Sequence, residues 1–326
     1  MHGDLMPFSV KTGTDYDEIN SPALDLKVLR CGAEPFSLKL HHPQLGDVGL
    51  LLNDDQLEAD HHYWKSHAPF LFPIVGGLVG GKSVTGDGRE IALGGHGFAR
   101  TTTFALCDSG SNDHSAWLEY FIDNSMVAWS DTNKYPWKFR FGVRFVITGN
   151  RLYTEMKVRN LDNAQMWYQL GWHPGFHTPV DIKHGSRNDV ELLLPKGECP
   201  LYECDRDSFL TGKVETIKTG GAFHFDDRGL DYTYVLDMNN YADRWAALRD
   251  PHSGITTKVL FPDLPHLGLW AMPDSPYICI EPWQGADDFT EKSLFEKKFG
   301  IASLLPGEND SRTVTVEISF DDGNKK

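Results

Sequence analysis

The segment Lys138-Phe139-Arg140-Phe141-Gly142-Val143-Arg144-Phe145-Val146-Ile147 decides the fold class of this chain. Apolar residues fill every second position, namely Phe139, Phe141, Val143, Phe145 and Ile147, while the basic residues stand between them. Successive side chains of a β-strand point to opposite faces, so this spacing predicts a strand with one buried and one solvated face. Half-buried strands of this kind are typical of antiparallel sheets.

The same alternation recurs along the chain, at residues 152–159 and 313–320. Thr148-Gly149-Asn150 and Gly86-Asp87-Gly88 are turn sequences between strand candidates. Long amphipathic helical patterns are scarce, and the best short helix candidate is Thr290 to Phe299. No linker or repeat of fixed period interrupts the pattern. We therefore expect one all-β domain over residues 1–326, built from two large, packed, twisted antiparallel sheets.

Composition narrows the function classes. The chain has 326 residues with 40% hydrophobic content, which is enough for a large core. Its formal net charge of −15 argues against nucleic acid and anionic membranes as partners. The N-terminal residues have no basic region followed by an apolar run, and no stretch of ~18 apolar residues occurs. These features predict a soluble cytoplasmic protein.

Cysteines and paired histidines suggest no metal cofactor. The five cysteines are odd in number and irregularly spaced, so we expect buried free thiols and no disulfide framework. Cys199 and Cys204 lack the second pair that a structural zinc site needs. Adjacent histidines on a strand point to opposite faces, so His41-His42 and His61-His62 are poor chelators. We expect both pairs to be solvated loop histidines.

Three separate segments each carry one residue that can move protons, and they are Gly94–Arg100, Gly171–Phe176 and Cys279–Gly285. Two histidines and one glutamate suffice for acid–base catalysis without metal or cofactor. His173 ends a strand-like stretch before Pro174, and it is either placed for proton transfer or a core histidine that caps a loop carbonyl. His96 lies between two glycines that permit close approach of a ligand, or it faces solvent in a turn.

Glu281 is the sharpest single candidate. It ends the apolar run Pro276–Ile280, and a buried carboxylate is almost always paired or functional. Trp283 offers a flat apolar face on which a sugar could stack, or it packs in the core. Arg100 could bind a substrate oxygen or pair with a carboxylate. Asp231 opens a strand-like segment, where a turn carboxylate is also commonplace.

Taken in order, these segments resemble the aldose 1-epimerase (mutarotase) family, and most of all its branch of LacX-like epimerase proteins. The similar pieces are Pro69–Gly76, His96–Arg100, His173–Phe176 and Glu281–Trp283, within a resemblance that extends from about Leu26 to about Phe320. The resemblance implies a β-supersandwich (galactose mutarotase-like) fold and interconversion of the α and β anomers of an aldohexose. It also implies that Glu281 is the general base, that His173 is the general acid on the other side of the anomeric centre, that His96 binds near the ring oxygen, and that Asp231 binds sugar hydroxyls.

The chain departs from the galactose mutarotase pattern in ways that leave the sugar open. Val75–Gly81 lacks the substrate-binding arginine of that family, and Tyr232 stands where a histidine is usual. A hexose-6-phosphate 1-epimerase is the alternative, for which Arg100, Arg140 and Lys82 are the candidate phosphate ligands. A non-catalytic carbohydrate-binding or regulatory protein is a third possibility. The combination of His96, His173 and Glu281 favours an enzyme, because binding alone requires neither an acid nor a base.

Overall fold

The computed structural model describes residues 7–52, 63–180, 185–223 and 233–321. In these residues the chain forms strands and four short 3-10 turns, and every strand pair is antiparallel. The 3-10 turns are η2 (Val79–Gly81), η3 (Ala99–Thr101), η4 (Arg187–Asp189) and η5 (Phe295–Lys297). No helix in the described ranges is long and apolar enough to cross a membrane. The all-β prediction is confirmed.

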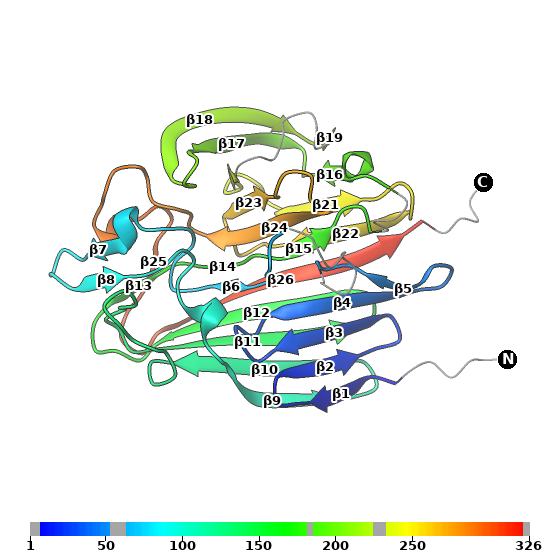
Figure 1. Cartoon of the computed structure of the whole chain (residues 1–326), viewed down its shortest axis with the longest axis horizontal. Coiled ribbons are helices and arrows are strands. Elements are labelled where there is room, and N and C mark those ends of the chain that lie inside the picture. Colours follow the sequence, from blue (N-terminus) through cyan, green and yellow to red (C-terminus); the bar gives the residue numbers. More distant parts are fainter. Residues whose placement is uncertain (1–6, 53–62, 181–184, 224–232, 322–326) are drawn as a thin grey trace.

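The largest sheet has nine strands. Their order is β19 (Ala222–Phe223), β16 (Glu191–Leu193), β21 (Trp245–Arg249), β22 (Ile255–Leu260), β26 (Asn309–Phe320), β12 (Arg151–Asn160), β11 (Phe139–Thr148), β10 (Ala116–Asp123) and β9 (Ala105–Ser111). Figure 1 shows β26, β12, β11 and β10 side by side across the middle of the molecule. The three alternating segments of the sequence are thus β11, β12 and β26, and the turn at Gly149 joins the first two.

The second large sheet has eight strands. Their order is β18 (Leu210–Thr219), β17 (Gly197–Cys204), β20 (Tyr234–Asp237), β23 (His266–Trp270), β24 (Tyr277–Gln284), β14 (Leu170–Trp172) and β6 (Phe70–Leu71), with β15 (Gly175–His177) also paired to β24. Two small sheets pair β7 (Lys82–Val84) with β8 (Glu90–Ala92) and β13 (Met166–Tyr168) with β25 (Ala302–Leu304).

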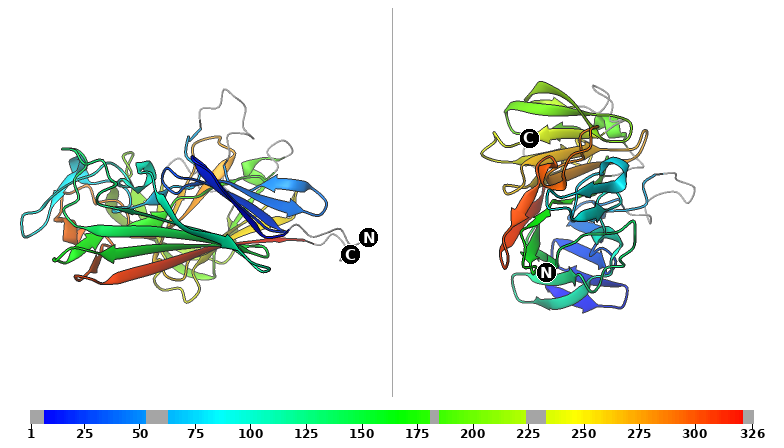
Figure 2. Two further views of the ribbon diagram at one scale, coloured as in Figure 1. Left: turned by 90° about the horizontal axis from the view of Figure 1, so that it is seen from below. Right: turned by 90° about the vertical axis from the view of Figure 1, so that its left-hand side faces the viewer.

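A third sheet of five strands comes from the N-terminal part of the chain. It consists of β1 (Ser9–Thr12), β2 (Tyr16–Asn20), β3 (Leu24–Leu29), β4 (Pro35–His42) and β5 (Gly46–Gly49). Figure 2 shows these strands over one face of the nine-stranded sheet. Tyr120 Oη on β10 donates to Asp17 on β2 at 2.8 Å. The chain after β5 continues to the eight-stranded sheet, because His177 N donates to Leu50 O at 2.9 Å. The sandwich therefore has one nine-stranded layer, opposed by two smaller sheets.

Aromatic side chains fill the space between the layers. The alternating apolar face of β11, from Phe139 to Ile147, is fully buried. Phe72, next to β6, stacks on Phe141 with ring centroids 4.6 Å apart, and Phe70 contacts both Phe145 and Trp172. Ring pairs at these separations add to the free energy gained from burial. The core thus fixes β6 and β14, the two strands that lead into the candidate site.

Three local predictions are wrong. Thr290–Phe299 contains only the 3-10 turn η5, because its carbonyls bond to distant segments: Ser293 O accepts from Ser83 and Phe299 O accepts from Gln169. His41 and His42 lie on β4, where His41 sits between Asp25 and Asp47 and His42 is buried, so neither is a solvated loop residue. All five cysteines are free thiols as expected, but Cys31 and Cys107 are exposed. His61 and His62 lie outside the described residues.

Candidate active site

Two neighbouring strands bring His173 and Glu281 together. Gly171 pairs with Trp283 between β14 and β24, and Gly175 pairs with Cys279 between β15 and β24. These two pairings share one register, so His173 stands directly opposite Glu281. Residues that face each other across antiparallel strands have Cβ atoms ~4.5–5.5 Å apart. A separation of more than a hundred residues in sequence is thus closed by strand pairing alone.

Prolines interrupt the ladder at this point. Pro174 and Pro282 follow the two site residues, and proline has no N–H to donate between strands. β14 ends at Trp172 and β15 begins at Gly175, and between them Ile280 N donates to Pro174 O at 3.2 Å. The sequence placed Glu281 at a strand end, but β24 continues through Pro282 to Gln284. The strand continues because Leu267 of β23 still pairs with Pro282 on its other side.

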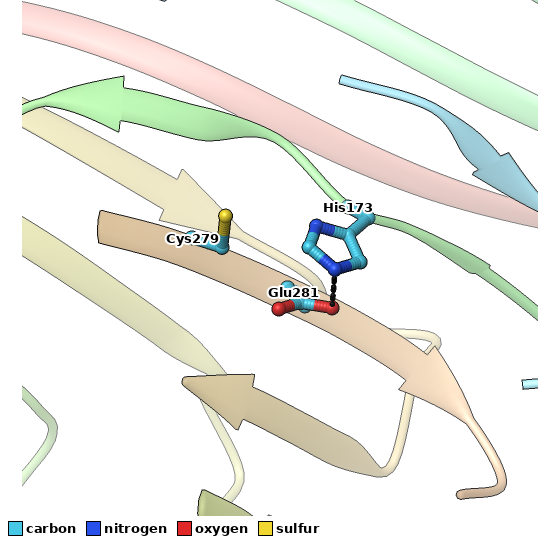
Figure 3. Close-up of side chains that lie close together, drawn as sticks. All are labelled: His173, Cys279 and Glu281. Carbon is cyan, nitrogen blue, oxygen red and sulfur yellow. Dashed lines mark ion pairs between the residues drawn. The ribbon is translucent and has the colours of Figure 1, made fainter. Parts of the chain in front are cut away.

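The two side chains are in contact. His173 Nε2 lies 3.1 Å from Glu281 Oε2, and the side chains are 9% and 1% exposed (Figure 3). The His173 ring thus meets a carboxylate, and its role in proton transfer stays a prediction. The resemblance implied an acid and a base on opposite sides of a sugar; here the two groups lie side by side.

His96 approaches the same place from a loop beside β6. The backbone N–H of His96 donates to Gly76 O at 2.7 Å, and the ring nitrogen Nδ1 accepts from Gly76 N–H at 3.1 Å. Because Nδ1 accepts a hydrogen bond, the ring proton resides on Nε2, which makes the neutral ring a donor at that atom. The ring centroids of His96 and His173 are 5.5 Å apart. His96 therefore belongs to the site and is not a turn residue facing bulk solvent.

Burial controls the protonation of the three groups. It raises the pKa of Glu281 well above its ordinary value, and the charge of Asp287 adds to this shift. It lowers the pKa of His173 well below its ordinary value, with His96 as the second cause. It also lowers the pKa of His96 to about 3, with Arg100 and Lys298 as further causes. His96 is thus neutral at physiological pH, and burial favours the uncharged forms of both His173 and Glu281.

These residues line a cavity of about 370 Å³. Among the described residues its wall also includes Arg100, Trp64, Trp270 and Thr233. The Trp64 ring covers the His173 ring at a centroid distance of 4.6 Å and an angle of 31°. No carboxylate in the described ranges forms an ion pair with Arg100, so its guanidinium is available at the cavity. Arg100 therefore lies at the cavity, and its contact with a substrate oxygen stays a prediction.

Trp283 lines the cavity floor and is also a core residue. Its side chain is 1% exposed and packs with Leu71 and Val235. A Cβ at Gly171 would lie 2.5 Å from Trp283 Cδ1, and one at Gly268 would lie 2.6 Å from its six-membered ring. Trp283 therefore lies flat against two glycine backbones on the strands that flank β24. Asp231 is outside the described residues, so its predicted contact with sugar hydroxyls stays a prediction.

Sequence reasoning missed a second acidic group in the cavity, Asp287. Its Oδ1 accepts from Gly77 N–H at 2.6 Å, and its side chain would overlap any Cβ at Gly76. Burial raises the pKa of Asp287 to about 6, although Lys298 opposes the shift. No motif marks this residue, and only its distance of six positions from Glu281 could have drawn attention to it.

Comparison with known proteins identifies the family of the chain. A family profile described as aldose 1-epimerase matches residues 18–317. The chain belongs to the aldose 1-epimerase family. Plasmid-encoded LacX of Lactococcus lactis subsp. lactis is 27% identical over 291 residues, which cover 84% of this chain and 93% of LacX.

Solved structures of similar proteins share the fold. A galactose mutarotase related enzyme from Lactobacillus acidophilus has a TM-score of 0.81 at 26% identity, covering 95% of this chain and 100% of that chain. A galactose mutarotase-like protein from Lactobacillus casei ATCC 334 has a TM-score of 0.78 at 23% identity, covering 93% of this chain and 100% of that chain. This aldose 1-epimerase family member is thus an enzyme of the isomerase type with the galactose mutarotase-like β-sandwich fold, as the resemblance implied.

Proposed function

We propose that this enzyme interconverts the α and β anomers of a neutral aldose, with Glu281 as general base and His173 as general acid. The observation that carries the proposal is the contact of the two groups, 3.1 Å apart on paired strands at a cavity wall. A carboxylate and an imidazolium can remove one proton and supply another in the same step. A non-catalytic sugar-binding protein has no need of this pair.

The reaction needs two proton transfers in each direction. Glu281 takes the proton of the anomeric hydroxyl while His173 protonates the ring oxygen, and the bond between C1 and the ring oxygen breaks to leave an aldehyde. After rotation about the C1–C2 bond, His173 takes the proton back from the chain hydroxyl and Glu281 returns its proton to the carbonyl oxygen. The ring closes on the other face, and both groups regain their starting states. Each such transfer typically contributes ~10²–10⁴-fold.

The contact between the two groups supports this cycle. While the sugar ring is closed, His173 carries the proton and Glu281 is ionised. Once the sugar ring has opened, Glu281 carries a proton and His173 is neutral. Burial favours the neutral forms of both groups, which are the forms they have while the sugar ring is open. Because Nε2 and Oε2 are within hydrogen-bond reach, the proton can pass between them in the free enzyme and both states are accessible. His96 Nε2–H then donates a hydrogen bond near the ring oxygen.

The charges of the cavity favour a neutral sugar over a sugar phosphate. Asp207, Glu281 and Asp287 line it, while Arg100 is the single arginine or lysine among its described lining residues. A phosphate dianion is bound best by several arginine or lysine donors. Arg140 instead packs over the Phe121 ring at 3.7 Å on the nine-stranded sheet, and Lys82 lies on β7 outside the cavity lining. A volume of about 370 Å³ lies at the small end of the ~300–1,000 Å³ typical of ligand pockets, which suits a monosaccharide.

Polarimetry and NMR exchange spectroscopy of anomers test the proposal directly. We expect acceleration with one or more neutral aldoses, and a loss of about 10²–10⁴-fold in Glu281→Gln and in His173→Ala. His252→Ala is the matched control, because this ring is 57% exposed and lies outside the cavity lining. Full activity in the first two variants, or no acceleration with any aldose, would overturn the assignment. Faster exchange with hexose 6-phosphates than with free hexoses would overturn the neutral substrate class.

A further inference from the structure

Cys279 lies beside the acid–base pair and takes no part in the proposed reaction. It is two residues before Glu281 on β24, and residues two apart on a strand point to the same face. The ligand atoms of His173, Cys279 and Glu281 all lie within 4.8 Å of one another. Figure 3 shows the three side chains close together. All three residues are buried, and the thiol is 0% exposed.

These groups have unused hydrogen-bonding capacity. His173 Nδ1 and Glu281 Oε1 are buried and have no hydrogen-bond partner among the described residues, while Glu281 Oε2 meets His173 Nε2 at 3.1 Å. Buried polar atoms without partners are uncommon in folded proteins, and an ion is one established explanation. Such atoms would gain most from a ligand that could satisfy several of them at once.

The donor set matches a thiophilic divalent cation. Imidazole nitrogen, thiolate sulfur and carboxylate oxygen are the three ligand types of zinc sites, at ~2.0–2.3 Å from the ion. Tetrahedral ligands at those bond lengths are ~3.2–3.8 Å apart, so His173 Nε2 and Glu281 Oε2 at 3.1 Å need almost no movement. The sulfur lies up to 4.8 Å from the other two atoms, so it would move by up to about 1.2 Å. The open cavity leaves the fourth position to water, an arrangement found in zinc sites with three protein ligands.

We propose that His173, Cys279 and Glu281 bind a thiophilic divalent cation such as zinc, and that the bound ion inhibits the enzyme. Inhibition follows because a bound ion would coordinate the His173 nitrogen that carries the acidic proton and would neutralise the Glu281 carboxylate that acts as base. Isomerisation depends on both groups. Inhibition rests on the proposed function, whereas ion binding does not.

Cobalt(II) serves as the optical probe, since its thiolate complexes absorb in the near ultraviolet. The test uses the full chain with Cys31 and Cys107 replaced by serine, which removes the two exposed thiols. We expect one equivalent of cobalt to produce the charge-transfer band, zinc to displace it, and Cys279→Ser to weaken binding by at least about tenfold. Cys199→Ser is the matched control, because Cys199 is equally buried but contacts Met238 in the core. No band in the parent protein, or an unchanged band in Cys279→Ser, would overturn the proposal.

A second measurement covers the case in which the serine variant does not fold. X-ray absorption of the zinc-loaded parent should show one sulfur scatterer at ~2.3 Å among lighter ligands, and a first shell without sulfur would refute the site. In activity assays, zinc should inhibit the parent at least about tenfold more strongly than Cys279→Ser. Cobalt binding in a protein that isomerises no sugar would refute the proposed function but not the ion site. Sugar isomerisation by a protein that shows no cobalt band would refute the ion site but not the proposed function.

Discussion

Replacing Lys298 with methionine should destabilise the protein strongly, because this residue is a buried cation beneath the cavity. Its Nζ lies 3.0 Å from Asp288 Oδ1 and donates to Gly77 O, also at 3.0 Å. The two charged side chains are 1% and 4% exposed. Methionine retains the length of the stem but removes the charge, so Lys298→Met leaves the Asp288 carboxylate buried without a counterion and the Gly77 carbonyl without its donor.

The magnitude follows from this burial. Removal of one partner of a buried ion pair typically costs about 3–5 kcal/mol, most of which is the penalty of the charge left behind. We therefore expect the free energy of unfolding of Lys298→Met to fall by about 3–5 kcal/mol at pH 7. Removal of both charges in Asp288→Asn/Lys298→Met should restore most of the loss, because neutral replacements of buried pairs are often nearly isoenergetic with the pair. The amide oxygen of asparagine can still accept from Val79 N–H, which now donates to Asp288 Oδ2 at 3.2 Å.

Urea unfolding followed by tryptophan fluorescence measures these differences, and unchanged m-values show that the unfolded state is comparable. Lys213→Met is the matched control, since its pair with Glu203 is 3.1 Å long but 77% and 51% exposed. Exposed pairs of this kind contribute less than about 1 kcal/mol. The reasoning is refuted if Lys298→Met costs no more than this control, or if the double variant is no more stable than Lys298→Met.

Three further predictions concern the cavity. Gly171→Ala places a methyl group 2.5 Å from Trp283 Cδ1, so we expect a loss of about 1–3 kcal/mol of stability and lower activity. Gly221→Ala is the control and should change neither, because a Cβ there meets open space. Equal melting temperatures of the two variants would contradict this packing. Because burial lowers the pKa of His173, this ring should take up its second proton only below the ordinary histidine value of 6.5, so the acid-side fall of kcat should lie below that pH; a fall centred at 6.5 would count against it. The pKa of Asp287 is raised to about 6, so its carboxylate is protonated as the pH falls through 6, and KM should rise there. This pH dependence of KM should be absent in Asp287→Asn, and its persistence in that variant would exclude Asp287 as the cause.

Local patterns in the sequence were sufficient for the strands that carry most of the fold. The alternation in β11, β12 and β26 needs only the two-residue period of a strand and one buried face, and both are local properties. The segment Thr290–Phe299 was mispredicted for the opposite reason. Its backbone is bonded to β7 and to Gln169, and no pattern within the segment records those partners.

In the candidate site too, local patterns revealed some residues, whereas contacts between distant segments revealed others. His96, His173 and Glu281 could be selected because each stands among glycines, prolines and aromatic residues, and because their order resembles one enzyme family. The continuation of β24 past Pro282 could not be predicted, since proline usually ends a central strand and only the pairing with β23 overrides that tendency. Asp287 and Lys298 carried no local signal, because their importance lies in contacts with Gly77 across the fold.

The sequence by itself determined the β architecture and the family, and it singled out the candidate proton-carrying residues, because alternation and short motifs are encoded in neighbouring positions. The tertiary structure alone decided that His173 stands opposite Glu281 in one register, and that Asp287, and not an arginine, faces the cavity beside Gly77. It also decided the direction of the pKa shifts, since burial and charge proximity arise only when distant segments pack together. Distances between atoms far apart in the chain are properties of the folded layers.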